Sequence, residues 1–200
     1  SFYNEFSVMK KIILIGGGGH CASVIDVIEQ ENKFKIAGII DKSSKIGKKL
    51  LGYHVIGEDS DLQSLSKKYN YALVTVGQIK SPKLRIKLFE KILNAGFQIP
   101  TIISPRAYVA QGSSIGKGTV IMHDALINNN SFIGKNCIIN SKALVEHDVV
   151  IEDHCHISTN AIINGEVRLC KESFIGSGSI IADGRIINSN SFIKAGSLYK

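Results

Sequence analysis

The chain has 200 residues, of which 44 % are hydrophobic and 20 % charged, and its formal net charge is +7. This balance fits one or two globular domains with a real core and excludes a disordered chain. Because no apolar run approaches the roughly 18 residues of a membrane helix, a membrane-spanning protein is excluded as well.

The start of the chain carries no basic and apolar stretch of the kind that directs secretion, so we expect a cytoplasmic protein. Met9 begins the first apolar segment, and residues 1–8 are interpreted as an added leader. The cysteines form no C-x-x-C pair, which favours neither a disulfide, a redox pair nor a metal site; they are Cys21, Cys137, Cys155 and Cys170. The positive charge favours anionic partners. Since Lys and Arg are scattered and not interleaved with aromatic residues, phosphorylated small molecules are favoured over nucleic acid.

The first half, residues 9–102, is predicted to be a small α/β domain. Apolar runs and helical spacing predict strands over 10–15, 35–40, 71–76 and 98–103, and helices over 21–30, from 59 or 60 to 69, and over 83–94. Residues 42–58 are interpreted as a basic connection. The alternation of strands and helices implies a parallel sheet that binds ligands at the carboxyl ends of its strands.

A glycine-rich turn, residues 16–19 followed by His20, joins the first strand to the first helix. Such a turn presents main-chain amides and a helix N-terminus to a phosphate. The spacing Gly17-x-Gly19-x-x-Ala22, with Asp41 about twenty residues further on, also fits the dinucleotide pattern, but a domain of about 90 residues lacks the second half of that fold. A single nucleotide diphosphate fits better, and a tight turn without a ligand stays open as the alternative.

The second half, residues 103–200, repeats with a period of six. Every sixth position from Ile103 to Ile193 is Ile, Val or Leu, and the residue four places later is small or compact except at Arg185. Three such units make one coil of about 18 residues, with the aliphatic side chains stacked inside a triangular prism. The sequence therefore predicts a parallel β-helix of hexapeptide repeats.

The ordered set of motifs resembles that of one family. The turn Gly16-Gly17-Gly18-Gly19-His20, then Asp41 and Gly77, precede a hexapeptide prism that contains Val145-Glu146-His147-Asp148. This set is similar to that of the bacterial sialic acid O-acetyltransferases and nucleotide-4-amino-sugar N-acetyltransferases, over residues 10–200. The resemblance implies a Rossmann-like domain that binds a nucleotide sugar, and a left-handed β-helix that binds acetyl-CoA between the subunits of a homotrimer.

The resemblance also implies catalytic residues. His147 matches the general base and Asp148 its acidic partner, with Glu146 as the competing choice. Gly165 matches a glycine whose amide binds the thioester oxygen, and it follows His147 by one coil, roughly 4.8 Å along the prism. His156 matches a histidine near the acetyl group. It lies half a coil from His147, so we expect the two to meet across a subunit interface.

Further residues are expected to bind the two substrates. Those expected at acetyl-CoA are His156, Gly165, Gly176, Ser177, Ala195 and Gly196. Those expected at the nucleotide sugar are Gly18, Gly19, His20, Asp41, Lys42, Gly77, Gln78 and Arg85. No metal is expected, because outward polar positions of the repeat produce the spacing of His154 and His156 equally well.

The resemblance implies transfer of an acetyl group from acetyl-CoA to the 4-amino group of a nucleotide-linked 4-amino-4,6-dideoxy sugar, in surface polysaccharide biosynthesis. A neutral imidazole is suited to take the proton of the attacking amine near pH 7, while a carboxylate fixes its tautomer, so no acylated enzyme is required. Two alternatives stay open: O-acetylation of sialic acid or a related sugar, and a non-catalytic hexapeptide scaffold or nucleotide-sugar sensor.

Overall fold

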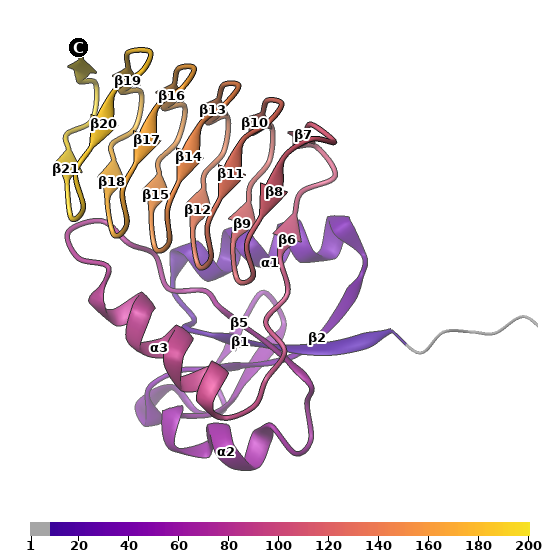
Figure 1. The fold of residues 1–200 in the computed structure, drawn as a ribbon. Helices are drawn as coiled ribbons and strands as arrows, with labels where there is room; N and C mark the ends of the chain where they lie inside the picture. Colours follow the sequence, from indigo (N-terminus) through magenta and orange to yellow (C-terminus); the bar gives the residue numbers. More distant parts are fainter. Residues whose placement is uncertain (1–8) are drawn as a thin grey trace, which may run out of the picture.

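The computed structural model describes residues 9–200, in which an α/β domain packs against one side of a long prism of short strands (Figure 1). Residues 1–8, interpreted above as a leader, lie outside the described residues. The N-terminal domain contains β1 (Lys10–Ile15), α1 (Gly19–Glu31), β2 (Phe34–Ile40), η1 (Ser43–Lys45), β3 (Lys49–Leu50), β4 (Tyr53–Gly57), η2 (Asp59–Asp61), α2 (Leu62–Leu65), β5 (Tyr71–Val74) and α3 (Lys83–Asn94). No helix among the described residues is long and apolar enough to cross a membrane.

The sheet of this domain has the strand order β3-β4-β2-β1-β5 and is parallel except for the β3–β4 pair. Side chains of β1 alternate between its two faces: Ile12 and Leu14 pack with α1, whereas Ile13 and Ile15 pack with α3. The predicted α/β domain is confirmed. Its helices cover both faces, which leaves the carboxyl ends of β1, β2 and β5 together at one edge.

Three segments differ from the expectation. Residues 42–58 contain β4, which pairs with β2 and is therefore part of the sheet. Of the strand expected over 98–103, only Gln98 bridges to Tyr71, while Ile102 and Ile103 form the first strand of the prism. The helix expected to end at residue 69 is reduced to η2 and the four-residue α2. Segments this short depend on tertiary packing more than on their own propensity, so local pattern does not determine them.

The second half forms the predicted left-handed β-helix, whose three sides are parallel sheets of two-residue strands. Side I contains β6 (Ile102–Ile103), β9 (Val120–Ile121), β12 (Ile138–Ile139), β15 (His156–Ile157), β18 (Phe174–Ile175) and β21 (Phe192–Ile193). Side II contains β7 (Tyr108–Val109), β10 (Leu126–Ile127), β13 (Leu144–Val145), β16 (Ile162–Ile163), β19 (Ile180–Ile181) and β22 (Leu198–Tyr199). Side III contains β8 (Ser114–Ile115), β11 (Phe132–Ile133), β14 (Val150–Ile151), β17 (Arg168–Leu169) and β20 (Ile186–Ile187).

The register of the prism follows from the repeat. Ile121 pairs with Ile139 and Ile139 with Ile157, so that equivalent residues are 18 apart. The inward aliphatic residues form one continuous core without solvent exposure over most of its length. Small corner residues are buried as well, and Ser131 Oγ donates to the carbonyl of Glu146 at 2.7 Å. This bond uses a corner carbonyl that would otherwise lack a partner inside the prism.

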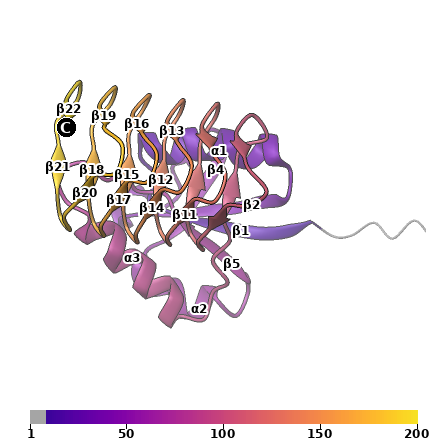
Figure 2. The same cartoon turned by 45° about the horizontal axis from the view of Figure 1, so that its top comes forward.

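From Gly118 to Gly196, each corner contains one residue with left-handed backbone, and the sequence provides Asn, Asp or Gly at most of these positions. Asn130 and Asn190 have φ values of 58° and 60°, so each occupies the left-handed position of its corner. The tight corners keep successive coils in line, as the turned view in Figure 2 shows.

The N-terminal domain docks onto side I. α1 runs beside the first coils, where its apolar face shares a core with Ile102, Val120 and Met122 (Figure 2). A polar chain closes the same contact: His123 binds Asp26 of α1 and Ser104, each at 2.6 Å. This docking brings the turn after β5 against side I, where Gln78 Nε2 donates to the carbonyl of His154 at 2.9 Å.

Candidate active site

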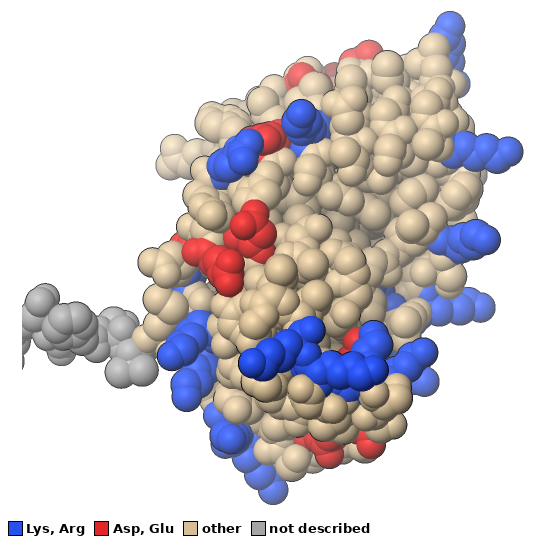
Figure 3. All heavy atoms as spheres, turned by 180° about the vertical axis from the view of Figure 1, so that it is seen from behind, with Lys and Arg blue, Asp and Glu red and all other residues tan. Residues whose placement is uncertain are grey.

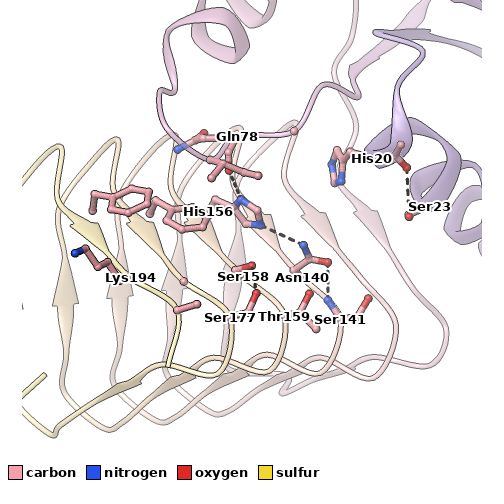
Figure 4. A pocket seen from close by; sticks show the side chains of 17 residues that line it. His20, Ser23, Gln78, Asn140, Ser141, His156, Ser158, Thr159, Ser177 and Lys194 are labelled. Atoms are coloured by element: carbon pink, nitrogen blue, oxygen red, sulfur yellow. Dashed lines mark hydrogen bonds between the residues drawn. The ribbon is translucent and has the colours of Figure 1, made fainter. Parts of the chain in front are cut away.

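A pocket of about 690 Å³ lies where the N-terminal domain meets side I (Figure 4). The start of α1 and the turn after β5 form one wall, and side I with its corner to side II forms the other. Among its lining residues are four expected at the nucleotide sugar and four expected at acetyl-CoA: Gly19, His20, Gly77 and Gln78, and His156, Gly176, Ser177 and Ala195. The fold thus brings part of each predicted set together in one chain.

His156 is held in one tautomer in this pocket. Its Nδ1 lies 2.5 Å from the carbonyl oxygen of Gln78, which only accepts, so Nδ1 carries the proton. Asn140 Nδ2 then donates to the lone pair of Nε2 at 3.2 Å (Figure 4). Burial, with a smaller contribution from the nearby Arg85 charge, lowers the pKa of His156 to about 4. This imidazole is therefore neutral at physiological pH, and both of its ring nitrogens are hydrogen-bonded.

His20 is a second neutral imidazole in the same pocket. Burial, followed by the charge of Arg85 and the neighbouring His156, lowers the pKa of His20 to about 3. Its Nε2 is buried without a hydrogen-bond partner among the described residues. An unpaired buried nitrogen is costly unless a ligand supplies the partner, so His20 is suited to bind a polar group in the pocket.

The start of α1 is open to an anion. Gly18 caps the helix without any side-chain hydrogen bond, and the first turn contains no acidic residue. A Cβ atom at Gly18 or Gly19 would meet nothing within 4 Å, so the space beside these two residues is open. Gly16 has a different role: its φ is +105° and a Cβ there would lie 2.3 Å from Val76 Cγ1, so the sharp turn itself requires glycine.

Asp41 and Lys42 line a neighbouring pocket of about 550 Å³ at the carboxyl ends of β1 and β2. Asp41 Oδ2 accepts from the Gly17 amide at 2.8 Å and from Lys45 Nζ at 2.9 Å, and Oδ1 accepts from the Lys42 amide at 2.7 Å. Burial acts to raise the pKa of Asp41, but these hydrogen bonds outweigh it and hold the pKa below its ordinary value. The carboxylate therefore ties the glycine-rich turn to β2 and shapes the edge where a nucleotide is expected.

Arg85 does not lie where the resemblance implied. It is 1 % exposed, and its guanidinium donates to the carbonyls of Val74, Val76 and Asn136 and to Asn136 Oδ1. Burial lowers its pKa to about 10, which leaves it charged. The helix α3 turns this side chain under the ends of the strands, so Arg85 joins the two domains and lines neither the junction pocket nor the pocket at Asp41.

His147 and Asp148 lie at the corner between sides II and III. His147 Nδ1 is 2.8 Å from Asp148 Oδ2, and the carboxylate accepts, so Nε2 is free as a base. The hydrogen bond that His147 donates to Asp148, together with the charges of Asp148, Glu146 and Glu166, raises the pKa of His147. Between the two acidic residues left open by the sequence, the geometry selects Asp148, since Glu146 instead accepts from Asn128 Nδ2 at 2.8 Å.

Gly165 lies directly beneath the ring of His147, one coil further along the same corner. A Cβ atom built on Gly165 would approach His147 Cε1 to 2.8 Å and Nε2 to 2.9 Å. Within residues 9–200 the amide of Gly165 donates to no acceptor. The His147 ring and an unpaired main-chain N–H group therefore belong to successive coils of one corner.

The two parts of the predicted site are not adjacent within one chain. His147 and Gly165 lie at the corner between sides II and III, whereas His156 lies on side I, and His147 does not line the junction pocket. Gly18 and Gly196 also stay outside the lining residues, each next to one that belongs to it. Gly176 lines the pocket, but a Cβ there would lie 2.4 Å from the Ala195 amide, so stacking of coils alone already requires glycine.

Several pocket residues were not singled out from the sequence. Asn140 binds His156, and Ser158 Oγ lies 2.8 Å from Ser177 Oγ. Phe174 and Phe192 stack at 5.0 Å, with His156 edge-on to Phe174 at 5.2 Å. These aromatic residues occupy the outward position of side I in the two coils after His156. Outward residues compared in steps of 18, instead of six, would have found them.

Positive charge gathers on the N-terminal domain. Residues 9–102 contain 15 Lys and Arg against 8 Asp and Glu, whereas residues 103–200 contain 9 against 8. Figure 3 shows this contrast from behind, with blue side chains mainly over the lower domain and a largely tan prism above it. The excess charge thus surrounds the domain whose turns are suited to a diphosphate.

Models of known protein families match both halves of the chain. The model described as PglD N-terminal domain matches residues 11–92, and that of the bacterial transferase hexapeptide (six repeats) matches residues 130–165. In a search of curated proteins, none matches the sequence significantly.

Solved structures resemble the chain over nearly its whole length. A histidine-to-asparagine mutant of perosamine N-acetyltransferase from Caulobacter crescentus, in complex with CoA and GDP-perosamine, is 29 % identical with a TM-score of 0.89, covering 96 % of this chain and 90 % of that chain. The acetyltransferase domain of PglB from Neisseria gonorrhoeae, in complex with acetyl coenzyme A, is 28 % identical with a TM-score of 0.87, covering 96 % and 93 %. WeeI from Acinetobacter baumannii, at 23 % identity and a TM-score of 0.74 over 94 % and 95 %, supports the fold alone.

The two family models match the chain in the same order as its two structural domains. The PglD-type model falls on the α/β domain and the hexapeptide model on the prism. The chain is therefore an acyltransferase, and its structure is similar to those of perosamine N-acetyltransferase and the PglB acetyltransferase domain.

Proposed function

We propose that the protein is an acetyl-CoA-dependent N-acetyltransferase that acts on the 4-amino group of a nucleotide-linked 4-amino-4,6-dideoxy sugar. The observation that carries this proposal is the junction pocket, because the glycine-rich turn of the N-terminal domain and the prism line it together. The Caulobacter protein in complex with CoA and GDP-perosamine and the PglB domain in complex with acetyl coenzyme A support the same pair of substrates. We place the reaction in the cytoplasm, as a step of surface polysaccharide biosynthesis.

The nucleotide sugar extends along the edge of the N-terminal sheet. Its diphosphate binds the amides of Gly18 and Gly19 at the start of α1, and its nucleoside occupies the pocket beside Asp41 and Lys42. The sugar then reaches the junction pocket beside His20, whose unpaired Nε2 gains a partner there. Acetyl-CoA lies along the corner between sides I and II, with its pantetheine arm on Ser177, Ala195 and Gly196.

The acetyl transfer needs one general base and one hydrogen-bond donor for the oxyanion. The amine nitrogen attacks the thioester carbonyl carbon while His147 Nε2 takes a proton from that nitrogen. Asp148 keeps Nδ1–H in place and stabilises the imidazolium. The carbonyl oxygen, negative once the C–N bond has formed, accepts from the free amide of Gly165. The C–S bond then breaks, and CoA leaves as a thiol with the proton that the imidazolium returns.

This arrangement requires more than one subunit, and we propose a homotrimer. His147 reaches the junction pocket only if that pocket belongs to a neighbouring copy, because the two lie at different corners of one prism. The outward residue of every coil on side II is apolar, and four of the six are markedly exposed: Tyr108, Leu126, Ile180 and Leu198. An apolar stripe of this length on a prism side is suited to packing against another subunit.

The test is thiol release from acetyl-CoA with UDP-, dTDP- and GDP-linked 4-amino sugars, and with CMP-sialic acid and free sialic acid as competing acceptors. We expect rapid turnover with an amino sugar and a fall in kcat of about 10²- to 10⁴-fold for His147→Ala, the usual contribution of general base catalysis. His54→Ala, at an exposed histidine of β4, is the matched control and should leave the rate unchanged.

Other outcomes would reject the proposal in different ways. Turnover with the sialic acids alone would move the protein to the O-acetyltransferase branch. Binding of acetyl-CoA without turnover of any acceptor would show that the acceptor class is wrong. Absence of both binding and turnover would favour the non-catalytic scaffold.

A further inference from the structure

Asp148 is held on both of its carboxylate oxygens. Oδ2 accepts from His147 Nδ1 at 2.8 Å, and Oδ1 accepts from Asn130 Nδ2 of the preceding coil. Asn130 and Asp148 are 18 residues apart, with φ values of 58° and 59°, so they occupy the same left-handed position in successive corners. Their side chains therefore lie one above the other, and the amide meets the carboxylate that in turn meets the imidazole.

A second amide of the same coil acts on the other carboxylate beside His147. Asn128 Nδ2 donates to Glu146 Oε2 at 2.8 Å. The charged groups that face His147 are Glu146 and Asp148 on its own coil and Glu166 on the next coil. Of these, Asp148 is the carboxylate that hydrogen-bonds the ring within the described residues, while Glu146 is bound to the preceding coil.

We infer that Asn130 is a positioning residue for the acyl transfer: it fixes Asp148 in the orientation that keeps His147 Nδ1 protonated and Nε2 free. The inference rests on the proposed role of His147 as the base. His147 and Asp148 have exposed side chains, and an exposed carboxylate without a second hydrogen bond would rotate into solvent. An amide suits this position, because it donates hydrogen bonds without adding charge or titrating.

The charges of the corner support the same chain of contacts. The hydrogen bond from Asn130 is the largest influence that lowers the pKa of Asp148, ahead of the bond to His147. The hydrogen bond to Asp148 is in turn the largest influence that raises the pKa of His147. Release of Asp148 from Asn130 therefore weakens the contact on which the protonation state of the base depends.

The test uses Asn130→Gly in the full-length protein. Glycine adopts the positive φ of this corner without strain, so the substitution removes the amide and leaves the backbone intact. Asn190→Gly is the matched control, since Asn190 has a φ of 60° at a corner near the end of the prism. Two quantities are measured: kcat and KM across pH, and the pH titration of His147 by NMR, assigned by comparison with His147→Ala.

For Asn130→Gly we expect kcat to fall about three- to thirtyfold with KM within twofold of wild type, and the titration midpoint of His147 to move to lower pH. Asn190→Gly should change neither. An unchanged titration and an unchanged kcat would overturn the inference, and so would an equal loss in both variants, which would show a general effect on the corner. If no acceptor is turned over at all, the proposed function fails, yet the titration still decides whether Asn130 acts on His147.

Discussion

Gly165→Ala is the substitution that separates catalysis from folding most sharply. The backbone at Gly165 has no positive φ, so alanine is conformationally allowed there. The new Cβ would lie 2.8 Å from His147 Cε1 and 2.9 Å from Nε2. Carbon atoms in contact keep a separation of about 3.5–4.0 Å, so the ring must move by roughly 0.7–1.2 Å.

This movement should change the free energy of unfolding little but lower kcat substantially. The side chain of His147 is 54 % exposed, so the ring swings outward without disturbing the core. A misplacement of about 1 Å in a catalytic group costs up to about 10²-fold. We therefore expect kcat to fall about ten- to hundredfold, with KM for both substrates and the thermal unfolding midpoint nearly unchanged. The amide proposed to bind the thioester oxygen is retained, since alanine keeps its N–H.

The assay is steady-state thiol release together with thermal unfolding of the same preparations. Asp183→Ala, one coil further along the same corner, is the control for any substitution at this surface and should behave as wild type. A kcat within twofold of wild type for Gly165→Ala would refute the reasoning, because it would mean that the observed position of the His147 ring is not the one used in catalysis.

Three further predictions concern pH and the domain junction. His20 and His156 have pKa values of about 3 and about 4 in the folded protein against an ordinary 6.5, so the unfolded chain binds more protons below pH 6.5 and stability falls as pH decreases. Each histidine lowers the free energy of unfolding by about 2 kcal/mol between pH 7.5 and pH 5. This loss is measured by urea unfolding at fixed protein concentration, and His20→Gln should remove about half of it. A free energy of unfolding that does not change with pH would contradict this assignment. Arg85→Met should cost about 2–4 kcal/mol of unfolding free energy, because it leaves buried carbonyls and Asn136 without a donor, and a loss below about 1 kcal/mol would show that the junction does not depend on it. Asp148→Asn should lower kcat and move the acid limb of its pH profile to lower pH, since the carboxylate is what raises the pKa of His147; an unmoved limb would assign that limb to another group.

Much of the fold was predictable because it repeats a strong local pattern. The inward position of each hexapeptide carries an aliphatic side chain, and those positions form the core of the prism as expected. β1 and α3 also have the bounds that their apolar spacing predicts. β4 could not be found in this way, because its burial depends on pairing with β2 and not on its own five residues.

Parts of the candidate site were predictable from residues that are neighbours along the chain or one coil apart in the repeat. Asp148 and Glu146 both flank His147, so the sequence could name both as candidate partners, and the structure shows that Asp148 makes the hydrogen bond. Arg85 shows the opposite case. A basic residue after a strand–turn–helix boundary is suited to a phosphate, but α3 directs this side chain inward, where main-chain carbonyls and Asn136 bind it. Nothing in the local pattern distinguishes the two directions.

The residues that matter most at the corner of His147 are neighbours at a distance of 18. Asn130 meets Asp148, Asn128 meets Glu146, and His147 covers Gly165, each pair one coil apart. In a prism of this kind the six-residue period specifies the core, whereas the 18-residue period specifies which outward side chains touch. A change at one outward position therefore affects the residues 18 before and 18 after it as well as its neighbours along the chain. Outward residues that are 18 apart in sequence contact one another on successive coils of the prism, so substitutions that test this surface are best chosen among such residues.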